Sequence, residues 1–215
     1  MGFLTHGSLF AGINGFGLGF AWAGIRTIWN VENDPDCQTV LRRWWPRPPL
    51  YGDATLLDWE TVESPDILSA GFPCQPFSLA GRRQGAADRR NLWPEVRRAG
   101  ANLRPRWIVC ENVPGLGAYL DTVCDDLEAI SYSVAPPLVV PAVAVGAPHR
   151  RHRVWIIAYT NPRNLRATRS DKTLGETSER KREASQRQRV RLDHCAVGML
   201  APDTTRQQKG SAVQP

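Results

Sequence analysis

The chain has 215 residues, 42% of them hydrophobic and 22% charged, which is long enough for one α/β core and a tail. Its net charge of +6 favours an anionic partner. No apolar run reaches the ~18 residues that a membrane-spanning helix needs, which argues against such a helix.

Residues 1–25 are apolar, but they lack a leading basic region and carry glycines from Gly7 to Gly24. Repeated glycine weakens a helix, so this segment predicts a strand and a turn rather than a signal peptide. The five cysteines are odd in number, and no two have the spacing of a zinc-binding pair. These features predict a cytoplasmic protein without a disulfide framework or a metal site.

Strand-like and helix-like segments alternate along most of the chain. Apolar runs predict strands over residues 4–10, 26–32, 46–53, 65–71, 106–112, 132–140 and 153–159. Helical patterns predict helices over residues 18–24, 35–45, 91–102 and 119–130. This alternation predicts an α/β fold with a doubly wound, mostly parallel sheet.

The positive charge is concentrated after the last predicted strand. Residues 1–159 carry 15 basic and 15 acidic residues, whereas residues 160–215 carry 12 basic and 6 acidic ones. The latter segment has few apolar residues, so it cannot bury enough surface to offset its ordering entropy. We expect a folded domain over residues 1–160 and a basic, disordered tail over residues 161–215, in which only residues 195–202 are apolar enough to dock.

Candidate functional residues follow successive predicted strands. In chain order they are Gly12, Glu32, Asp53, Cys74 and Glu111. The carboxyl ends of parallel strands meet at one edge of a sheet, and ligands bind there in doubly wound folds. The placement of all five residues at strand ends therefore predicts one site at that edge, and it does so more strongly than any single residue does.

The first strands predict a nucleotide-type pocket. Gly12 and Gly15 let a ligand approach the backbone, Glu32 suits a ribose diol, and Asp53 suits an adenine amino group. Each acid alone is more often a helix cap or a solvated residue, but together they favour an adenosine-containing cofactor. No Lys-Ser or Lys-Thr pair follows the glycine turn, so a phosphate-binding P-loop is not expected.

Cys74 lies between two prolines in "GFPCQPFS". A lone cysteine is usually an inert buried thiol, but the prolines stiffen this loop at the end of a predicted strand. Glu111 would raise the pKa of a neighbouring thiol, so it suits an acid acting on a substrate better than an activator of Cys74.

Arg151 and Arg153 have the spacing that places two residues on one face of a strand. Two guanidinium groups on one face suit a phosphate or a carbonyl oxygen. A plain basic strand edge is also consistent with this spacing.

Seven motifs in this order resemble those of the DNA cytosine-5 methyltransferase family over roughly residues 3–160. They are "SLFAGINGF", "VEND", "YGDA", "GFPCQPFS", "NLWPE", "ENVPG" and "GAPHRRHRV". The resemblance implies a Rossmann-like methyltransferase fold that uses S-adenosylmethionine, and a DNA substrate whose target base is flipped out of the duplex.

The resemblance also implies the role of each catalytic residue. Cys74 would attack C6 of cytosine, and Glu111 would bind N3 and the exocyclic amine. Arg153 would hold the O2 carbonyl, and Arg151 would help to position the base. Arginines of the loop 79–90 would close over DNA. The implied cofactor-binding residues are Phe10, Ala11, Gly12, Ile13, Asn14, Gly15, Glu32, Asn33, Asp53, Ala54, Pro73 and Leu92.

The sequence departs from the family pattern in a few places. Asn14 stands where glycine is usual; if φ is positive there, asparagine is the best-tolerated substitute, and weakened cofactor binding is expected. Asn33 and His152 also differ from the usual residues. We find no counterpart of the family's target-recognition domain or of its C-terminal "GN" motif. The expectation is therefore a DNA cytosine-5 methyltransferase whose catalytic portion this chain holds. The alternatives are a truncated, inactive remnant that binds cofactor or DNA, one half of a split enzyme whose second polypeptide supplies the rest, and an enzyme acting on tRNA cytosine.

Overall fold

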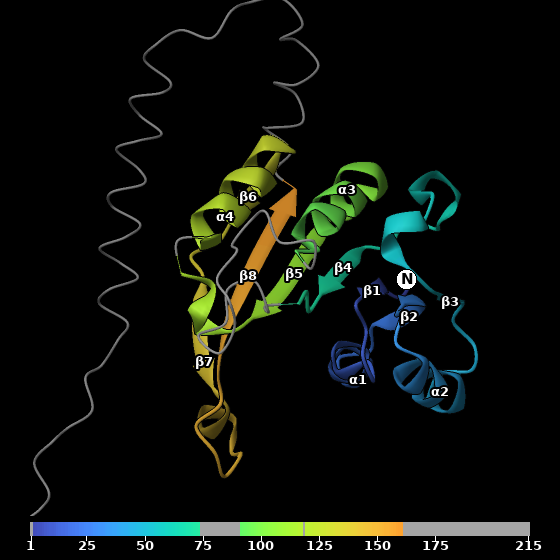
Figure 1. Ribbon diagram of the computed structural model, residues 1–215, viewed down its shortest axis with the longest axis horizontal. Coiled ribbons are helices and arrows are strands. Elements are labelled where there is room, and N and C mark those ends of the chain that lie inside the picture. Colours follow the sequence, from blue (N-terminus) through green and yellow to red (C-terminus); the bar gives the residue numbers. More distant parts are fainter. Residues whose placement is uncertain (1, 74–90, 118, 161–215) are drawn as a thin grey trace, which may run out of the picture. The chain divides into compact units, whose positions relative to one another are not determined.

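The computed structural model describes residues 2–73, 91–117 and 119–160, so the predicted tail lies outside the described part (Figure 1). Eight strands form one sheet in the order β3-β2-β1-β4-β5-β8-β6, with β7 paired to β8. The strands are β1 (Thr5–Leu9), β2 (Arg26–Val31), β3 (Leu50–Tyr51), β4 (Ile67–Ala70), β5 (Trp107–Asn112), β6 (Tyr132–Val134), β7 (Leu138–Pro141) and β8 (His152–Thr160).

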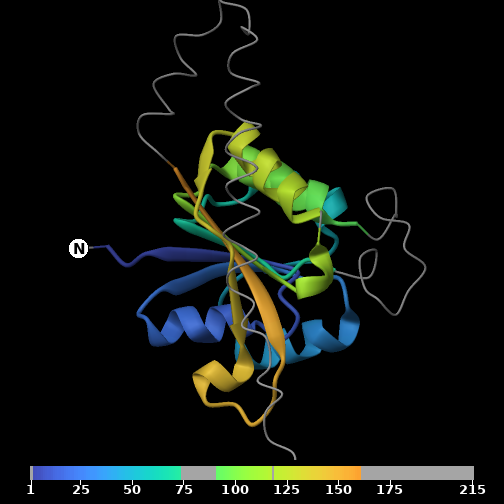
Figure 2. The same ribbon diagram turned by 90° about the vertical axis from the view of Figure 1, so that its left-hand side faces the viewer.

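Within the described segments, two α-helices lie on each face of this sheet. They are α1 (Gly15–Trp22), α2 (Pro35–Trp44), α3 (Trp93–Leu103) and α4 (Tyr119–Ala129). Figure 2 shows the blue α1 and α2 on one face and the green and yellow α3 and α4 on the other. Within the described ranges, no helix is long and apolar enough to cross a membrane.

The first five strands of the sheet are parallel, and the remaining pairs are antiparallel. This arrangement confirms the predicted doubly wound, mostly parallel sheet. The single strand predicted over residues 132–140 is wrong, because the segment forms β6 and β7 with a break between them. Pro136 and Pro137 lie in that break and have no N–H to donate to the ladder.

Local sequence explains where the helices start. Asp34 caps α2 by accepting hydrogen bonds from the backbone N–H groups of Asp36 and Cys37, and these bonds lower the pKa of Asp34. Pro35 occupies the first turn of α2, as expected. The first helix begins at Gly15 rather than at residue 18, because Asn14 caps it.

The core lies between the sheet and the pair α3 and α4. Its fully buried residues include Leu68, Ala70, Ile108, Cys110, Ile156 and Ala158. Burial raises the pKa of the Cys110 thiol to about 12, so this cysteine is an inert apolar residue. Gly7 is required in β1 because the ring of Trp29 occupies the space that a side chain there would fill.

A polar group, His6, is fully buried on the opposite side of β1. Its ring nitrogens lie 3.0 Å from Thr27 Oγ1 and 2.7 Å from Ser69 Oγ, and its ring packs 4.6 Å from that of Phe20. Burial lowers the pKa of His6 to about 3, so the folded protein holds it neutral.

This burial makes stability depend on pH. Between the unfolded pKa of about 6.5 and the folded value, only the unfolded chain takes up the proton, so stability is lost as the pH falls below the unfolded pKa. Between about pH 7 and about pH 5, His6 should cost about 2 kcal/mol of unfolding free energy. Urea unfolding at both pH values should show that His6→Gln loses less free energy of unfolding on acidification than the unaltered protein does. An equal loss in the two proteins would contradict this account.

Candidate active site

The parallel strands bring the predicted site residues to one edge of the sheet. Gly12 follows β1, Glu32 follows β2, Asp53 follows β3, Pro73 follows β4, and Glu111 lies at the end of β5. Because β1, β2, β3, β4 and β5 are neighbours in the sheet, these positions lie side by side along its carboxyl edge, as the strand pattern predicted (Figure 1).

The turn between β1 and α1 is built from unusual backbone conformations. Phe10, Gly12 and Asn14 have φ values of 53°, 55° and 63°. A side chain at Gly12 would meet no atom within 4 Å, so the turn faces open space. Ala11 and Gly12 are partly buried, whereas Ile13 and Gly15 are exposed. The positive φ values of the non-glycine residues Phe10 and Asn14 cost free energy. Strained backbone of this kind is typical of ligand-binding turns.

Asn14 has a left-handed conformation, with φ of 63°, so the condition under which asparagine is the best-tolerated substitute for glycine is met. Its Oδ1 accepts a hydrogen bond of 2.9 Å from Gly17 N–H and so caps α1. Its Nδ2 is buried without a hydrogen-bond partner among the described residues. A side chain at Gly17 would overlap Asn14, so these two residues fit only as a pair.

Glu32 links the glycine turn to the start of α2. Its side chain is buried, its Oε2 accepts from Gly12 N–H at 2.7 Å, and its Oε1 accepts from Asp34 N–H at 2.8 Å. Each oxygen still has a lone pair, which leaves the carboxylate able to accept from a vicinal diol. Asn33, beside it, is exposed.

Asp53 is exposed and caps a short helical turn. Its Oδ1 accepts from both the N–H and the hydroxyl of Thr55, each at 2.8 Å. Arg98 of α3 fixes this turn from behind by donating to the carbonyls of the buried Ala54 at 2.7 Å and of Leu57 at 2.9 Å. Sequence reasoning missed Arg98, because nothing in the helix pattern shows which backbone its side chain reaches.

The structure joins Glu111 and Arg153 directly. Glu111 Oε1 lies 2.5 Å from Arg153 Nε, and the two side chains are 26% and 21% exposed. Arg153 Nη1 also donates to the His152 carbonyl at 2.8 Å. Arg151 precedes β8 and is exposed, with no ion pair in the described part of the chain. The shared strand face predicted for Arg151 and Arg153 stays a prediction, and the structure adds a carboxylate–guanidinium pair that the sequence did not predict.

Asn112 is a further site residue that sequence reasoning did not single out. It is buried; its Nδ2 donates to the Phe72 carbonyl at 3.1 Å, and its Oδ1 accepts from Val113 N–H at 2.8 Å. It therefore ties the end of β5 to the segment that leads toward Cys74. The signal available in the sequence was its place in the "ENVPG" motif, at the end of a predicted strand.

Several predicted residues lie at or beyond the limit of the described segments. Pro73 is the last residue described before the gap and is half-buried, and Leu92 is half-buried at the start of α3. Cys74 and the loop 79–90 lie outside the described residues. Within the described residues, no three His, Cys, Asp or Glu side chains are grouped to hold a metal ion.

Comparison with known proteins identifies the family. The C-5 cytosine-specific DNA methylase model matches residues 4–209, and the chain belongs to this family. It is 36% identical over 163 residues to the Type II methyltransferase M.BsuFI of Bacillus subtilis, covering 73% of this chain and 39% of that protein. It is 37% identical over 164 residues to the Type II methyltransferase M.HpaII of Haemophilus parainfluenzae, and this match covers 72% of this chain and 46% of that protein.

Solved structures agree with this assignment. A candidate DNA modification methyltransferase encoded within an E. coli prophage superposes with a TM-score of 0.63 at 26% identity, covering 82% of this chain and 49% of that one. Spodoptera frugiperda DNMT2 gives a TM-score of 0.63 at 21% identity, and the match covers 74% of this chain and 50% of that one. This likeness shows the shared fold. The chain thus spans half or less of the length of these relatives.

The two roles of Asn14 can be separated by substitution. Asn14→Ala should lower the free energy of unfolding by about 2 kcal/mol, because it removes the cap and leaves a residue that disfavours the left-handed conformation. Asn14→Gly should cost less than about 1 kcal/mol, because glycine tolerates that conformation. Urea unfolding of the two variants measures both losses of unfolding free energy. Equal losses would mean that the left-handed backbone conformation of residue 14 contributes nothing to the difference.

Proposed function

We propose that this chain carries the catalytic centre of an enzyme that transfers a methyl group from S-adenosylmethionine to C5 of cytosine in DNA. The contact between Glu111 and Arg153 is the observation that carries the proposal. The edge of cytosine presents the O2 acceptor beside N3 and the exocyclic amine. A guanidinium donor touching a carboxylate acceptor complements that edge, once the base is turned out of the duplex.

The cofactor fits the residues present at the edge of the first three strands. The space at Gly12 accepts a ligand against the backbone, and Glu32 retains acceptor lone pairs for a ribose diol. Asp53 keeps Oδ2 without a hydrogen bond in the described segments, available to an adenine amine. We assign the remaining contacts to Phe10, Ala11, Ile13, Asn14, Gly15, Asn33, Ala54, Pro73 and Leu92. When bound, the cofactor supplies an electrophilic methyl group.

The chain's own residues prepare the base to accept that methyl group. Cytosine C5 is a weak nucleophile, so the Cys74 thiolate adds to C6 and makes C5 electron-rich. Glu111 must carry a proton to hydrogen-bond N3, because N3 and an ionised carboxylate are both acceptors. It gives this proton to N3 as negative charge develops, and Arg153 donates to O2. Arg151 is assigned to positioning of the base. Asn112, through the Phe72 carbonyl, holds the segment before Cys74 in place and acts as a positioning residue.

The wider setting follows from the same proposal. The relatives are Type II methyltransferases, which favours a role in restriction-modification. We also propose a second polypeptide that supplies the target-recognition function, which is one of the interpretations of the sequence. The division into a catalytic domain over residues 1–160 and a basic tail over residues 161–215 is kept as part of the proposal, and the cytoplasmic location stays a prediction.

Methyl transfer provides the first test. The chain is mixed with labelled S-adenosylmethionine and DNA, alone and together with the part of M.HpaII that lies outside its match to this chain. We expect label on cytosine in DNA in at least one combination and none on tRNA. Label on tRNA alone would move the substrate to RNA, and no transfer in either combination, with no binding of S-adenosylhomocysteine by calorimetry, would favour an inactive remnant.

Covalent trapping tests the catalytic residues. DNA containing 5-fluorocytosine should form a denaturant-resistant complex with the protein, because the fluorine blocks release of the enzyme from C6. Cys74→Ser should abolish the complex, and Glu111→Gln should slow its formation by about 10²–10⁴-fold.

Cys37→Ser is the matched control, because Cys37 lies in α2 and is half-buried away from β5. It should form the complex at the unaltered rate. A trapped complex that survives Cys74→Ser but not Cys37→Ser would refute the assignment of the nucleophile.

A further inference from the structure

The turn that carries Asp53 has little support from the sheet. We call residues 53–57 the Asp53 turn; it follows β3, which is an edge strand only two residues long. Inside the turn, Asp53 accepts from Thr55, and two long backbone hydrogen bonds of 3.2 Å and 3.4 Å complete the set. Because its own strand holds the turn so loosely, another element must fix the position of the carboxylate.

Arg98 of α3 supplies that support. Its Nη2 donates to the carbonyl of Ala54 at 2.7 Å, and its Nη1 donates to the carbonyl of Leu57 at 2.9 Å. In the described part of the chain, no other hydrogen bond joins the Asp53 turn to a different element. The two carbonyls lie near the start and at the end of the turn, so one planar guanidinium fork fixes both its position and its direction.

The guanidinium group of Arg98 is itself held in place. Its Nε donates to Glu95 Oε2 at 2.7 Å, and its central carbon lies 5.7 Å from the centroid of the Trp59 ring, which is buried. The side chains of Arg98 and Glu95 are 37% and 20% exposed, so water competes with these contacts only in part. A charge-assisted hydrogen bond and an aromatic ring together leave the guanidinium few other orientations.

The helix α3 is a rigid base for these contacts. It buries one face in the core, and Trp93 Nε1 donates to Asp126 Oδ2 of α4 at 2.7 Å. The same helix begins directly after Leu92, which is assigned to the cofactor. One helix therefore carries Leu92 and also the arginine that holds the Asp53 turn, so two flanks of the proposed cofactor site share one support.

We propose that Arg98 is a positioning residue for the cofactor and sets its preference for adenine. Through the carbonyls of Ala54 and Leu57, it holds Asp53 where Oδ2 accepts from the exocyclic amine. This inference rests on the proposed function, in which Asp53 binds that amine. An ionised carboxylate accepts from an amine but repels a carbonyl oxygen, so a fixed Asp53 rejects a purine with oxygen at that position. A carboxylate on a loose turn loses this discrimination.

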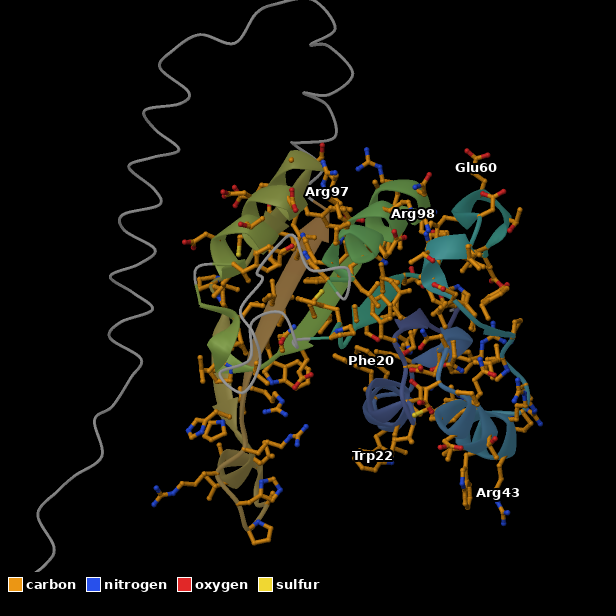
Figure 3. All side chains as sticks on the ribbon, in the orientation of Figure 1. Phe20, Trp22, Arg43, Glu60, Arg97 and Arg98 are labelled. Atoms are coloured by element: carbon orange, nitrogen blue, oxygen red, sulfur yellow. The ribbon has the colours of Figure 1, made fainter. Side chains whose placement is uncertain are left out.

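Arg97 is the matched control on the same helix. Figure 3 shows that the two arginines leave α3 in different directions, Arg98 toward the segment after β3 and Arg97 toward α4. Arg97 Nε lies 3.5 Å from Asp126 Oδ1, and its side chain is 47% exposed. Substitution of either arginine removes one charge and one ion pair from α3, but only Arg98 contacts the Asp53 turn.

Calorimetry with two ligands tests the inference. S-adenosylhomocysteine carries the amine, and S-inosylhomocysteine has a carbonyl oxygen in its place. The full chain should bind the adenosyl ligand about tenfold more tightly or better, because the inosyl ligand lacks the hydrogen bond to a charged acceptor. Arg98→Met keeps an unbranched side chain. It should weaken binding of the adenosyl ligand by about tenfold and of the inosyl ligand by less than about twofold. Arg97→Met should leave both affinities unchanged.

A second substitution shows whether Arg98 acts through Asp53. Asp53→Asn should lower the preference for the adenosyl ligand. The double variant with Arg98→Met should lose no more preference than Asp53→Asn alone, because effects of residues that act through one another are not additive. A further loss in the double variant would contradict the inference.

Arg98→Lys keeps the inference testable if Arg98→Met does not fold. An ammonium group lacks the planar fork that reaches both carbonyls. The preference for the adenosyl ligand should therefore lie between those of the unaltered chain and of Asp53→Asn. A preference equal to that of the unaltered chain would contradict the inference.

The remaining outcomes separate this inference from the proposed function. Equal weakening of both ligands by Arg98→Met would mean that this arginine only stabilises the fold, and it would leave the cofactor site in place. Equal affinity of the unaltered chain for the two ligands would overturn the inference in the same way. No binding of either ligand by the unaltered chain would reject the cofactor site itself, and the inference with it.

Discussion

The parallel pairing of β1 with β2 on one side and β4 on the other is the constraint on which the rest of this structure depends. It places the ends of these strands, and of β3 and β5 beyond them, along one edge. Gly7 allows it, because the ring of Trp29 packs directly over that residue. Polar residues that follow separate strands are thereby collected into one site, without any one of them being near another in the sequence.

Two backbone-directed carboxylates and one arginine hold the loops of this edge. Glu32 joins the turn after β1 to the start of α2, Asp53 caps the turn after β3, and Arg98 fixes that turn from α3. These contacts mean that the proposed cofactor side of the site is ordered without a ligand. Preorganisation of this kind lowers the cost of ordering on binding. The same side chains thus have a structural role and a proposed binding role.

The catalytic half of the site depends on a different part of the sheet. Arg153 meets Glu111 only because β8 runs antiparallel to β5, which returns the chain to the end of β5. The same pairing sets Trp107 beside Tyr159 on the side of β5 and β8 that faces away from α3 and α4, where both side chains are exposed among the described residues.

The sequence by itself determined much of the architecture. Alternating apolar runs and helical patterns predicted four helices and most of the strands, because side-chain periodicity is a local property. It also placed Gly12, Glu32, Asp53 and Glu111 at strand ends, and it identified asparagine as the substitute best tolerated at position 14 if φ there is positive. What it missed depends on contacts between distant residues.

Only the tertiary structure decided those contacts. Nothing local indicates that Arg98 reaches the carbonyl of Ala54. The break between β6 and β7 is different, because Pro136 and Pro137 were a local signal that the strand prediction overlooked. The tertiary structure also paired Arg153, rather than Arg151, with Glu111. Register between strands is set by packing across the whole sheet, and that packing is not encoded in any short stretch.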